Sequence, residues 1–251
     1  MLDSNNISWQ EKFPNNIKIE DLYIENSWKS LINILIANTN FKPVIKFLNE
    51  NKDKINIFPY PNYLFYSFNM VPLDKINVII LSQDPYHNTY CNIPQAMGLA
   101  FSVLPGFPFP SSLKNIFNNM KKFGHIKNIS SDGDLTYLAK QGCLLMNCAL
   151  TVSENKPGSH CETWQWFTDY IIEYLSNNYK NLIFVLWGAF AYKKIKFIDI
   201  DKHKVIISSH PSGLSYNKPM KSFPAFSDND HFGQINEYLI EFNKPILLYD
   251  K

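Results

Sequence analysis

Cysteine is scarce in this chain of 251 residues, and its placement is not that of a metal site. The four copies, Cys91, Cys143, Cys148 and Cys161, include no Cys-x-x-Cys pair and no paired cysteine–histidine cluster. Zinc and iron–sulfur centres are bound by such patterns, so the sequence argues against both. We expect four reduced thiols.

Long apolar runs and a leader pattern are also missing. No stretch reaches the roughly 18 apolar residues that a membrane span needs. The segment from Met1 to Glu20 lacks a basic stretch followed by an apolar one, and it carries acidic side chains. These features predict a soluble intracellular protein with no membrane partner, cytoplasmic if its source is bacterial or viral and nuclear if it is eukaryotic.

Charge of either sign is in small supply. Charged residues make up 18% of the chain, and 24 basic residues against 22 acidic ones leave a net charge of +2. This excludes a strongly basic coat for nucleic acid but allows a local basic patch, so any binding to DNA must depend on a defined site. The hydrophobic content of 45% is sufficient for a sizeable core.

The chain divides into a short extension and a long patterned region. Residues 1–25 are polar and weakly patterned, and we expect them to lie on or off the body of the protein. Apolar periodicity predicts helices over 27–36, 41–51, 112–123, 132–140, 164–175, 189–195 and 231–242. Short apolar runs predict buried strands over 77–81, 143–146, 182–186 and 205–207. This alternation predicts an α/β fold: a single domain over 26–251, with a central four-stranded parallel sheet flanked by helices on both faces.

An unusual polar sequence follows each predicted strand. These sequences are Gln83 to His87, Asn147, Trp187-Gly188, and Ser209 to Ser212. In open parallel sheets, ligands bind at the carboxyl ends of the strands. The pattern therefore predicts a site where Asp, Asn and His side chains meet at one edge of the sheet.

Each of these residues also has an ordinary explanation when it is taken alone. Asp84 precedes Pro85, and Asp-Pro commonly starts a turn. His210 fits a loop residue, and the amide of Asn147 fits one that satisfies backbone groups. Three apolar or aromatic residues fit the core or an unremarkable loop position equally well: Tyr86, Phe101 and Leu214.

Taken together, the motifs occur in an order that resembles the family 1 uracil-DNA glycosylases, from about Ser27 to about Leu239. The motifs are Gln83-Asp84-Pro85-Tyr86-His87, Gly98-Leu99-Ala100-Phe101-Ser102-Val103, Ser112-Leu113-Lys114-Asn115-Ile116, Gln141 to Asn147, Leu150-Thr151-Val152, Leu186-Trp187-Gly188 and His210-Pro211-Ser212-Gly213-Leu214-Ser215. The family fold is a single α/β domain around a four-stranded parallel sheet. The resemblance implies an enzyme that flips uracil out of DNA and hydrolyses its N-glycosidic bond, releasing uracil and leaving an abasic site in base excision repair.

The resemblance also implies which residues carry the chemistry. Asp84 orients the attacking water and stabilises the cationic sugar. Neutral His210 donates a hydrogen bond to uracil O2. Such a site stabilises the two separating charges without a metal or another cofactor.

Base recognition and DNA binding are implied for a further set of residues. Asn147 pairs with the O4 and N3–H edge of uracil, Phe101 stacks on the base, Tyr86 excludes the methyl group of thymine, and the backbone amide of Gln83 lies near O2. Leu214 enters the duplex where the base has left. Phosphate contacts and supporting roles fall to Ser112, Ser212, Ser215, His87 and His160. The implied partner is uracil-containing DNA, single- or double-stranded, with a proteinaceous inhibitor or replication proteins as further partners of a monomer.

The sequence departs from the family pattern mainly in the segments that grip DNA. Two segments are longer than usual, Asn88–Pro94 and Asn217–Asp230, and Lys221 in the second stands near the usual Arg. Single-residue departures are Ser82 for Gly, Met97 for His, Ser111 for Pro, Ala189 for Ser and Gly213 for Pro. These changes leave Asp84, Asn147 and His210 in place.

Two other classes of function compete with the glycosylase hypothesis. The altered phosphate loops would also fit a non-catalytic DNA-binding or replication-complex subunit, although retention of the three polar residues argues against it. An enzyme for a small metabolite is disfavoured, because no Gly-x-Gly-x-x-Gly loop follows the first strand of the sheet.

Overall fold

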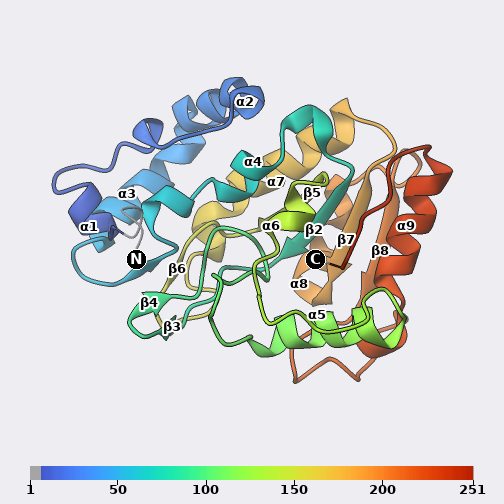
Figure 1. Ribbon diagram of the computed structural model, residues 1–251. Helices are drawn as coiled ribbons and strands as arrows, with labels where there is room; N and C mark the ends of the chain where they lie inside the picture. Colours follow the sequence, from blue (N-terminus) through green and yellow to red (C-terminus); the bar gives the residue numbers. More distant parts are fainter. Residues whose placement is uncertain (1–6, 251) are drawn as a thin grey trace.

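A computed structural model of the chain describes residues 7–250, and Figure 1 shows its arrangement. The central sheet has four parallel strands in the order β5, β2, β7, β8. These are β2 (Val78–Ser82), β5 (Cys143–Asn147), β7 (Ile183–Trp187) and β8 (Lys204–Ser208). The predicted four-stranded parallel sheet is therefore confirmed.

The two edge strands of the sheet, β5 and β8, differ in burial. Every residue of β2, β5 and β7 is buried, because helices cover both faces of the sheet. The edge strand β8 is only partly buried. Near-continuous apolar runs are the sequence pattern that such doubly covered strands require.

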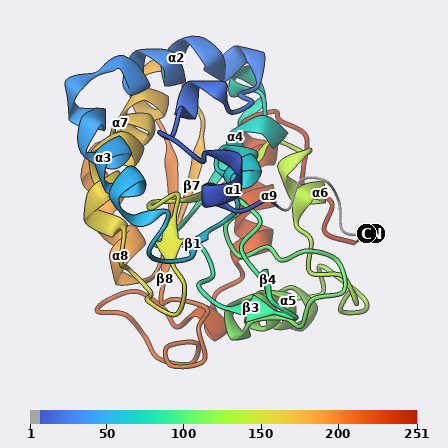
Figure 2. The same ribbon diagram turned by 90° about the vertical axis from the view of Figure 1, so that its left-hand side faces the viewer.

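Helices flank both faces of the sheet, as Figure 2 shows with α7 on one side and α6 and α9 on the other. The helices are α1 (Trp9–Lys12), α2 (Asn26–Ala37), α3 (Lys42–Asn51), α4 (Tyr66–Met70), α5 (Ser111–Lys122), α6 (Thr136–Ala139), α7 (Cys161–Asn178), α8 (Gly188–Tyr192) and α9 (His231–Glu241). Two small antiparallel pairs complete the fold: β1 (Ile57–Phe58) with β6 (Val152–Ser153), and β3 (Thr89–Tyr90) with β4 (Ile93–Pro94). Within residues 7–250, no helix is both long enough and apolar enough to cross a membrane.

The helix predicted over residues 132–140 is shorter than expected. Only Thr136–Ala139 is helical, because carboxylates upstream bind backbone amides locally. Oδ1 of Asp132 accepts from the amide of Asp134, and Oδ1 of Asp134 accepts from the amide of Thr136. Such bonds compete with those of a helix and hold the segment in turns.

The described part of the N-terminal extension lies on the body. Side chains spaced along it are buried in the same core as the sheet: Trp9, Phe13, Ile17, Ile19, Leu22 and Ile24. The indole of Trp9 donates to the carbonyl of Pro59 at 2.8 Å. Residues 1–6 lie outside the described part of the chain.

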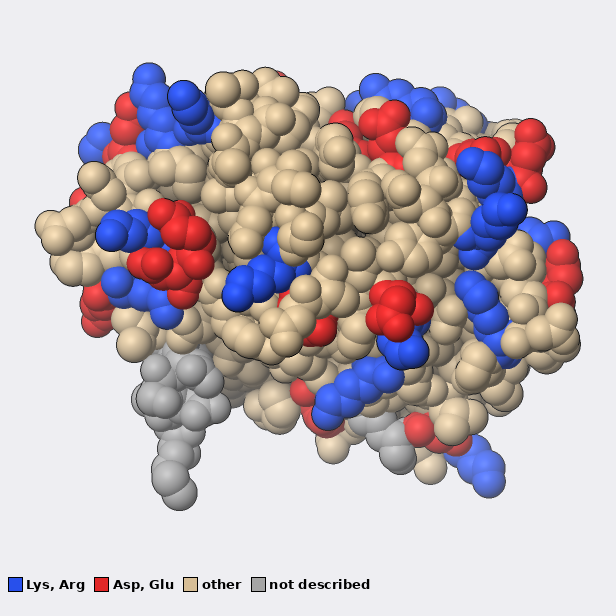
Figure 3. Space-filling view, turned by 90° about the horizontal axis from the view of Figure 1, so that it is seen from above, with Lys and Arg blue, Asp and Glu red and all other residues tan. Residues whose placement is uncertain are grey.

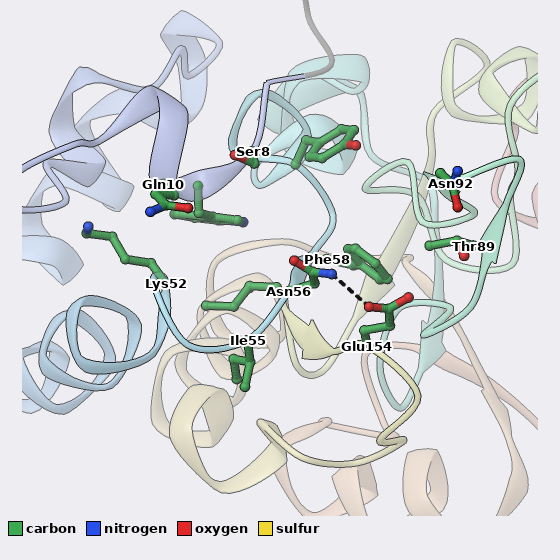
Figure 4. Close-up of a pocket in the computed structure, with 12 residues that line it drawn as sticks. Ser8, Gln10, Lys52, Ile55, Asn56, Phe58, Thr89, Asn92 and Glu154 are labelled. Atoms are coloured by element: carbon green, nitrogen blue, oxygen red, sulfur yellow. Dashed lines mark hydrogen bonds between the residues drawn. The ribbon is translucent and has the colours of Figure 1, made fainter.

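The longer segment at residues 88–94 forms the β3–β4 hairpin. The ring of Tyr90 packs on Phe107, with centroids 5.4 Å apart. Thr89 and Asn92 line a polar cavity of about 280 Å³ together with Ser8 and Gln10 of the N-terminal extension, as Figure 4 shows. The hairpin and the extension, which are far apart in sequence, therefore share one surface.

Charged side chains are interspersed over the face seen from above in Figure 3, which lies at the edge where the sheet strands begin. Lysine and acidic side chains alternate there between large uncharged areas. The loops that follow the strands lie at the opposite edge, at the bottom of Figure 1.

Candidate active site

The carboxyl ends of the four strands lie at one edge of the sheet. Ser82 at the end of β2 is in register with Asn147 at the end of β5, and Trp187 is in register with Ser208. A cavity of about 660 Å³ opens at this edge. Eight of the predicted site residues line it: Gln83, Asp84, His87, Phe101, Ser112, His210, Ser212 and Leu214.

Three predicted residues lie beside the cavity instead of appearing in its lining. The hydroxyl of Tyr86 donates to the carbonyl of Phe101 at 3.2 Å. Asn147 is 4% exposed and lies beside Ser82, which lines the cavity. The hydroxyl of Ser215 donates to the carbonyl of His210 at 3.0 Å.

The Asp84 carboxylate is held in place by a backbone amide. The N–H of Gly158 donates to its Oδ2 at 2.5 Å. Burial raises the pKa of Asp84, while this hydrogen bond and the nearby charge of His87 act in the opposite direction. The result is a rigid carboxylate with an increased affinity for protons, at the end of a buried strand.

The loop that supplies the Gly158 amide is fixed from two sides. The amide of Asn155 donates to the carbonyl of His87 at 2.9 Å. The side chain of Asn56 donates to Glu154 at 2.8 Å, the contact marked in Figure 4. These bonds hold the loop between the strand pair β1–β6 and the Asp84 segment.

The side chain of His160 contacts residues that precede the same loop. Its Nδ1 lies 2.8 Å from the hydroxyl of Thr151, and its Nε2 lies 2.8 Å from that of Ser153. Burial lowers its pKa to about 4, so the ring is neutral at pH 7. The structure places His160 in a supporting position that does not line the cavity.

His210 is arranged as a neutral hydrogen-bond donor. The amide of Ser212 donates to its Nδ1 at 3.0 Å, so a neutral ring carries its proton on Nε2. Burial lowers the pKa of His210 to about 4. At pH 7 the imidazole is therefore uncharged, with Nε2–H available to a ligand.

Gly188 makes room for that imidazole. Its φ of +91° is a conformation that favours glycine, and a Cβ atom built there would lie 2.8 Å from Cβ of His210. A side chain at position 188 would therefore displace the histidine. This explains the glycine directly after β7.

Phe101 forms an aromatic wall of the cavity. Its ring centroid lies 5.4 Å from that of Trp187 and 5.8 Å from that of His210. Its φ of +65° is strained for a bulky residue. The backbone is held there in part by the amide of Ala100, which donates to Leu145 on β5 at 3.1 Å.

Two buried polar atoms at this edge lack partners. Oδ1 of Asn147 and Nδ1 of His87 have no hydrogen-bond partner among residues 7–250. A buried unsatisfied polar atom costs about 1–3 kcal/mol. Because His87 lines the cavity and Asn147 lies beside Ser82 of its lining, these atoms fit a site that is completed by a ligand.

Hydrogen bonds brace the loop after His210, and the loop exposes Leu214 to solvent. The hydroxyls of Ser212 and Ser215 lie 2.9 Å apart, and the side chain of Asn115 on α5 donates to the carbonyl of Pro211 at 2.7 Å. On this braced loop, the side chain of Leu214 is 85% exposed. An exposed leucine side chain contributes no burial free energy to the fold, so its position is not explained by packing.

The model of the uracil DNA glycosylase superfamily matches residues 68–240, which include every predicted site residue. The chain belongs to this superfamily. Uracil-DNA glycosylase 2 of Bacteroides fragilis is 41% identical, over 87% of this chain and 95% of its own length. The crystal structure of mimivirus uracil-DNA glycosylase matches with a TM-score of 0.94 and 37% identity, over 100% of this chain and 97% of the other. A variant of mimivirus UNG in complex with UGI matches with a TM-score of 0.94 and 38% identity, over 99% of this chain and 98% of the other.

The sequence did not reveal every residue that shapes the superfamily site in this chain. Gly158, whose amide binds Asp84, lies 74 residues downstream of it. The dipeptide Pro157-Gly158 is a turn signal, but nothing local connects it to the carboxylate. Pro157 and Phe190 also line the cavity.

Proposed function

We propose that this protein is a family 1 uracil-DNA glycosylase that flips uracil out of DNA and hydrolyses the bond between base and sugar. One observation carries the proposal. A partly buried carboxylate, Asp84, and the neutral ring of His210 line the same cavity at the sheet edge. The ordered motifs from Gln83 to Ser215 support the assignment to family 1 within the superfamily.

The pair of residues matches the charges that develop when the glycosidic bond breaks. The sugar becomes cationic, and Asp84 stabilises it and orients the attacking water. The uracil ring becomes anionic, and Nε2–H of His210 donates to O2, where the charge gathers. Donors and carboxylates fixed in advance stabilise such a transition state more than water does, because they need not reorient.

We assign recognition of the base to residues around Asp84 and His210. Phe101 stacks on the flipped ring, and the backbone amide of Gln83 lies near O2. The unpartnered Oδ1 of Asn147 accepts the N3–H of uracil, while its amide donates to O4. Tyr86, tied to the carbonyl of Phe101, occupies the space that a C5 methyl group would need.

DNA binding is assigned to the rim of the cavity. Ser112, Ser212, Ser215 and His87 contact phosphates or support the loops that do. All 24 basic residues of the chain are lysines, so phosphate contacts depend on hydroxyls, amides and ammonium groups without arginine forks. Flipping the base costs a few kcal/mol, and Leu214 opposes its return.

Uracil-containing DNA is the proposed partner, bound by a monomer. A proteinaceous inhibitor is a second proposed partner, supported by the mimivirus protein that was crystallised with UGI. Binding to replication proteins and an intracellular location, cytoplasmic or nuclear according to the source, remain predictions.

Excision on oligonucleotides tests the proposed function. The purified chain is incubated with single- and double-stranded DNA that carries one uracil, without added metal, and abasic product and free uracil are quantified. We expect both products in equal amounts. Folded protein that binds the DNA and yields no abasic product would instead indicate a non-catalytic DNA-binding subunit.

Replacement of Tyr86 tests exclusion of thymine. We expect Tyr86→Ala to lower the preference for uracil over thymine by at least about tenfold, the usual effect of one methyl group in a tight pocket. Tyr86→Phe is the matched control, because it keeps the ring and removes only the hydroxyl. Excision from paired thymine and uracil oligonucleotides measures the ratio; an unchanged ratio in Tyr86→Ala would mean that another group excludes the methyl.

Replacement of Leu214 tests the proposed wedge. We expect Leu214→Ala to slow excision from duplex about tenfold or more and to change excision from single strands about twofold at most, because only a duplex has a stack to hold open. Leu248→Ala is the matched control, since Leu248 is another exposed leucine, with an exposed fraction of 64%. Equal losses on the two substrates would contradict the wedge.

A further inference from the structure

Trp187, which lines the cavity, donates a hydrogen bond to a buried histidine outside the predicted site, His231. Trp187, the last residue of β7, lines the cavity and is 2% exposed. Its indole Nε1–H donates to Nδ1 of His231 at 3.2 Å. His231 is the first residue of α9 and is fully buried.

The surroundings of His231 specify one tautomer. Nδ2 of Asn229 also approaches Nδ1, at 3.1 Å, so that nitrogen faces two N–H groups and must be the acceptor. Nε2 therefore carries the proton and faces the carbonyl of Phe226 at 3.3 Å. Burial lowers the pKa of His231 to about 3, in agreement with a neutral ring.

Trp187 connects His231 to the cavity through ring contacts. Its ring packs on Phe101 at 5.4 Å, and Phe101 packs on His210 at 5.8 Å. The next residue, Gly188, is the one whose missing Cβ admits His210. A rotated indole would displace Phe101, the proposed stacking ring, and the donor His210 beside it.

We propose that His231 is a positioning residue for base excision, which holds the Trp187 indole so that Phe101 and His210 stay in their productive places. This rests on the proposed function of the Asp84–His210 site. His231 touches neither the base nor the sugar, so its effect reaches the reaction only through Trp187.

Aromatic packing is the competing explanation for a fixed indole. Trp187 also contacts the rings of Phe226 and Phe232, with centroids 5.0 and 6.2 Å away. If packing alone held the ring, the hydrogen bond would be dispensable. The test must therefore remove the acceptor with little change of shape.

Asparagine and leucine provide a matched pair at position 231. They are similar in size, and only asparagine keeps an acceptor where Nδ1 of histidine lies. Turnover on a uracil-containing single strand is measured for both variants, for Trp187→Phe, and for the double variant Trp187→Phe/His231→Leu. Urea unfolding of each variant reports its stability separately.

We expect His231→Leu to lower kcat about tenfold and to leave KM within about twofold, because displacement of reacting groups affects the chemical step and the DNA contacts lie elsewhere. His231→Asn should retain at least about a third of the wild-type kcat, whatever its loss of stability. Trp187→Phe should also lose about tenfold, and the double variant should lose about as much as either single one, since both remove the same bond.

Four results would overturn the inference. The first is a folded His231→Leu variant with wild-type kcat, and the second is a His231→Asn variant as slow as His231→Leu. The third is single losses that multiply in the double variant. If His231→Leu does not fold, Trp187→Phe decides: wild-type kcat in that variant also overturns it. Failure of the proposed function is distinguishable, because the wild-type protein itself would then release no uracil.

Discussion

Replacing Asp84 by asparagine should reduce the rate of uracil excision by at least about a hundredfold, because loss of one preorganised charge-stabilising group commonly costs 10²–10³ in kcat. The amide is similar in size and can still accept the N–H of Gly158, so the geometry of the loop should persist. DNA affinity should change little, since the proposed role of Asp84 is at the sugar of the flipped nucleotide and not at the phosphates. Single-turnover excision and a binding titration measure the two quantities.

The pH dependence provides an independent check on Asp84. Burial raises its pKa in the folded state, so the active carboxylate takes up a proton at a higher pH than an ordinary aspartate does. The wild-type rate should therefore fall as the pH drops through this raised pKa. The same shift makes ionisation of Asp84 destabilise the fold above that pKa, so Asp84→Asn should not lower the free energy of unfolding at pH 8.

Asp74→Asn serves as the control for a lost carboxylate. That side chain is 64% exposed and pairs only with Lys75 among the ion pairs of residues 7–250. Its replacement should leave excision unchanged. Wild-type activity in Asp84→Asn would remove the carboxylate from the mechanism and with it the central step of the proposed reaction.

Replacing His210 by leucine should lower kcat about a hundredfold, the cost of removing one donor to a developing oxyanion. His210→Gln is the matched variant, because its amide can place a donor near the position of Nε2. We expect glutamine to restore about tenfold of the loss, since a flexible amide is less well held than an imidazole braced by Ser212. An equal loss of kcat in His210→Leu and His210→Gln would indicate that the ring acts by its shape and not as a hydrogen-bond donor.

The protonation state of His210 can be measured through stability. Its pKa is lowered from 6.5 to about 4 on folding, so the unfolded chain binds more protons between these values. Stability should therefore be lost as the pH falls from 6.5 toward 4, and His210→Leu should lose less over this range than the wild type. His160 and His231 remain in both proteins and titrate in the same direction, so the difference between the two curves isolates His210.

Local sequence patterns predicted the sheet well. A run such as Asn77 to Leu81 is apolar at every central position, and only a strand covered on both faces buries all of them. The same reasoning located β5, β7 and β8. It failed at residues 132–135, where the side chains of Asp132 and Asp134 bind the backbone in place of helical carbonyls.

The positions of Asp84, Asn147 and His210 after predicted parallel strands also indicated a common edge for them. Parallel strands end at the same edge, so residues that follow them gather there whatever the details of packing. The roles of these residues in the reaction stay predictions until the variants are measured. The structure added the cavity itself and showed that eight of the predicted residues line it.

By itself, the sequence determined the parallel sheet and the identity of the polar residues at its edge, because both follow from local periodicity and from topology. Only the tertiary structure decided that the amide of Gly158 holds Asp84, that His231 holds Trp187, and that the N-terminal extension joins the core. Each of these contacts joins segments distant in the chain. Their geometry depends on how loops pack over the sheet, and no period along the sequence encodes that packing.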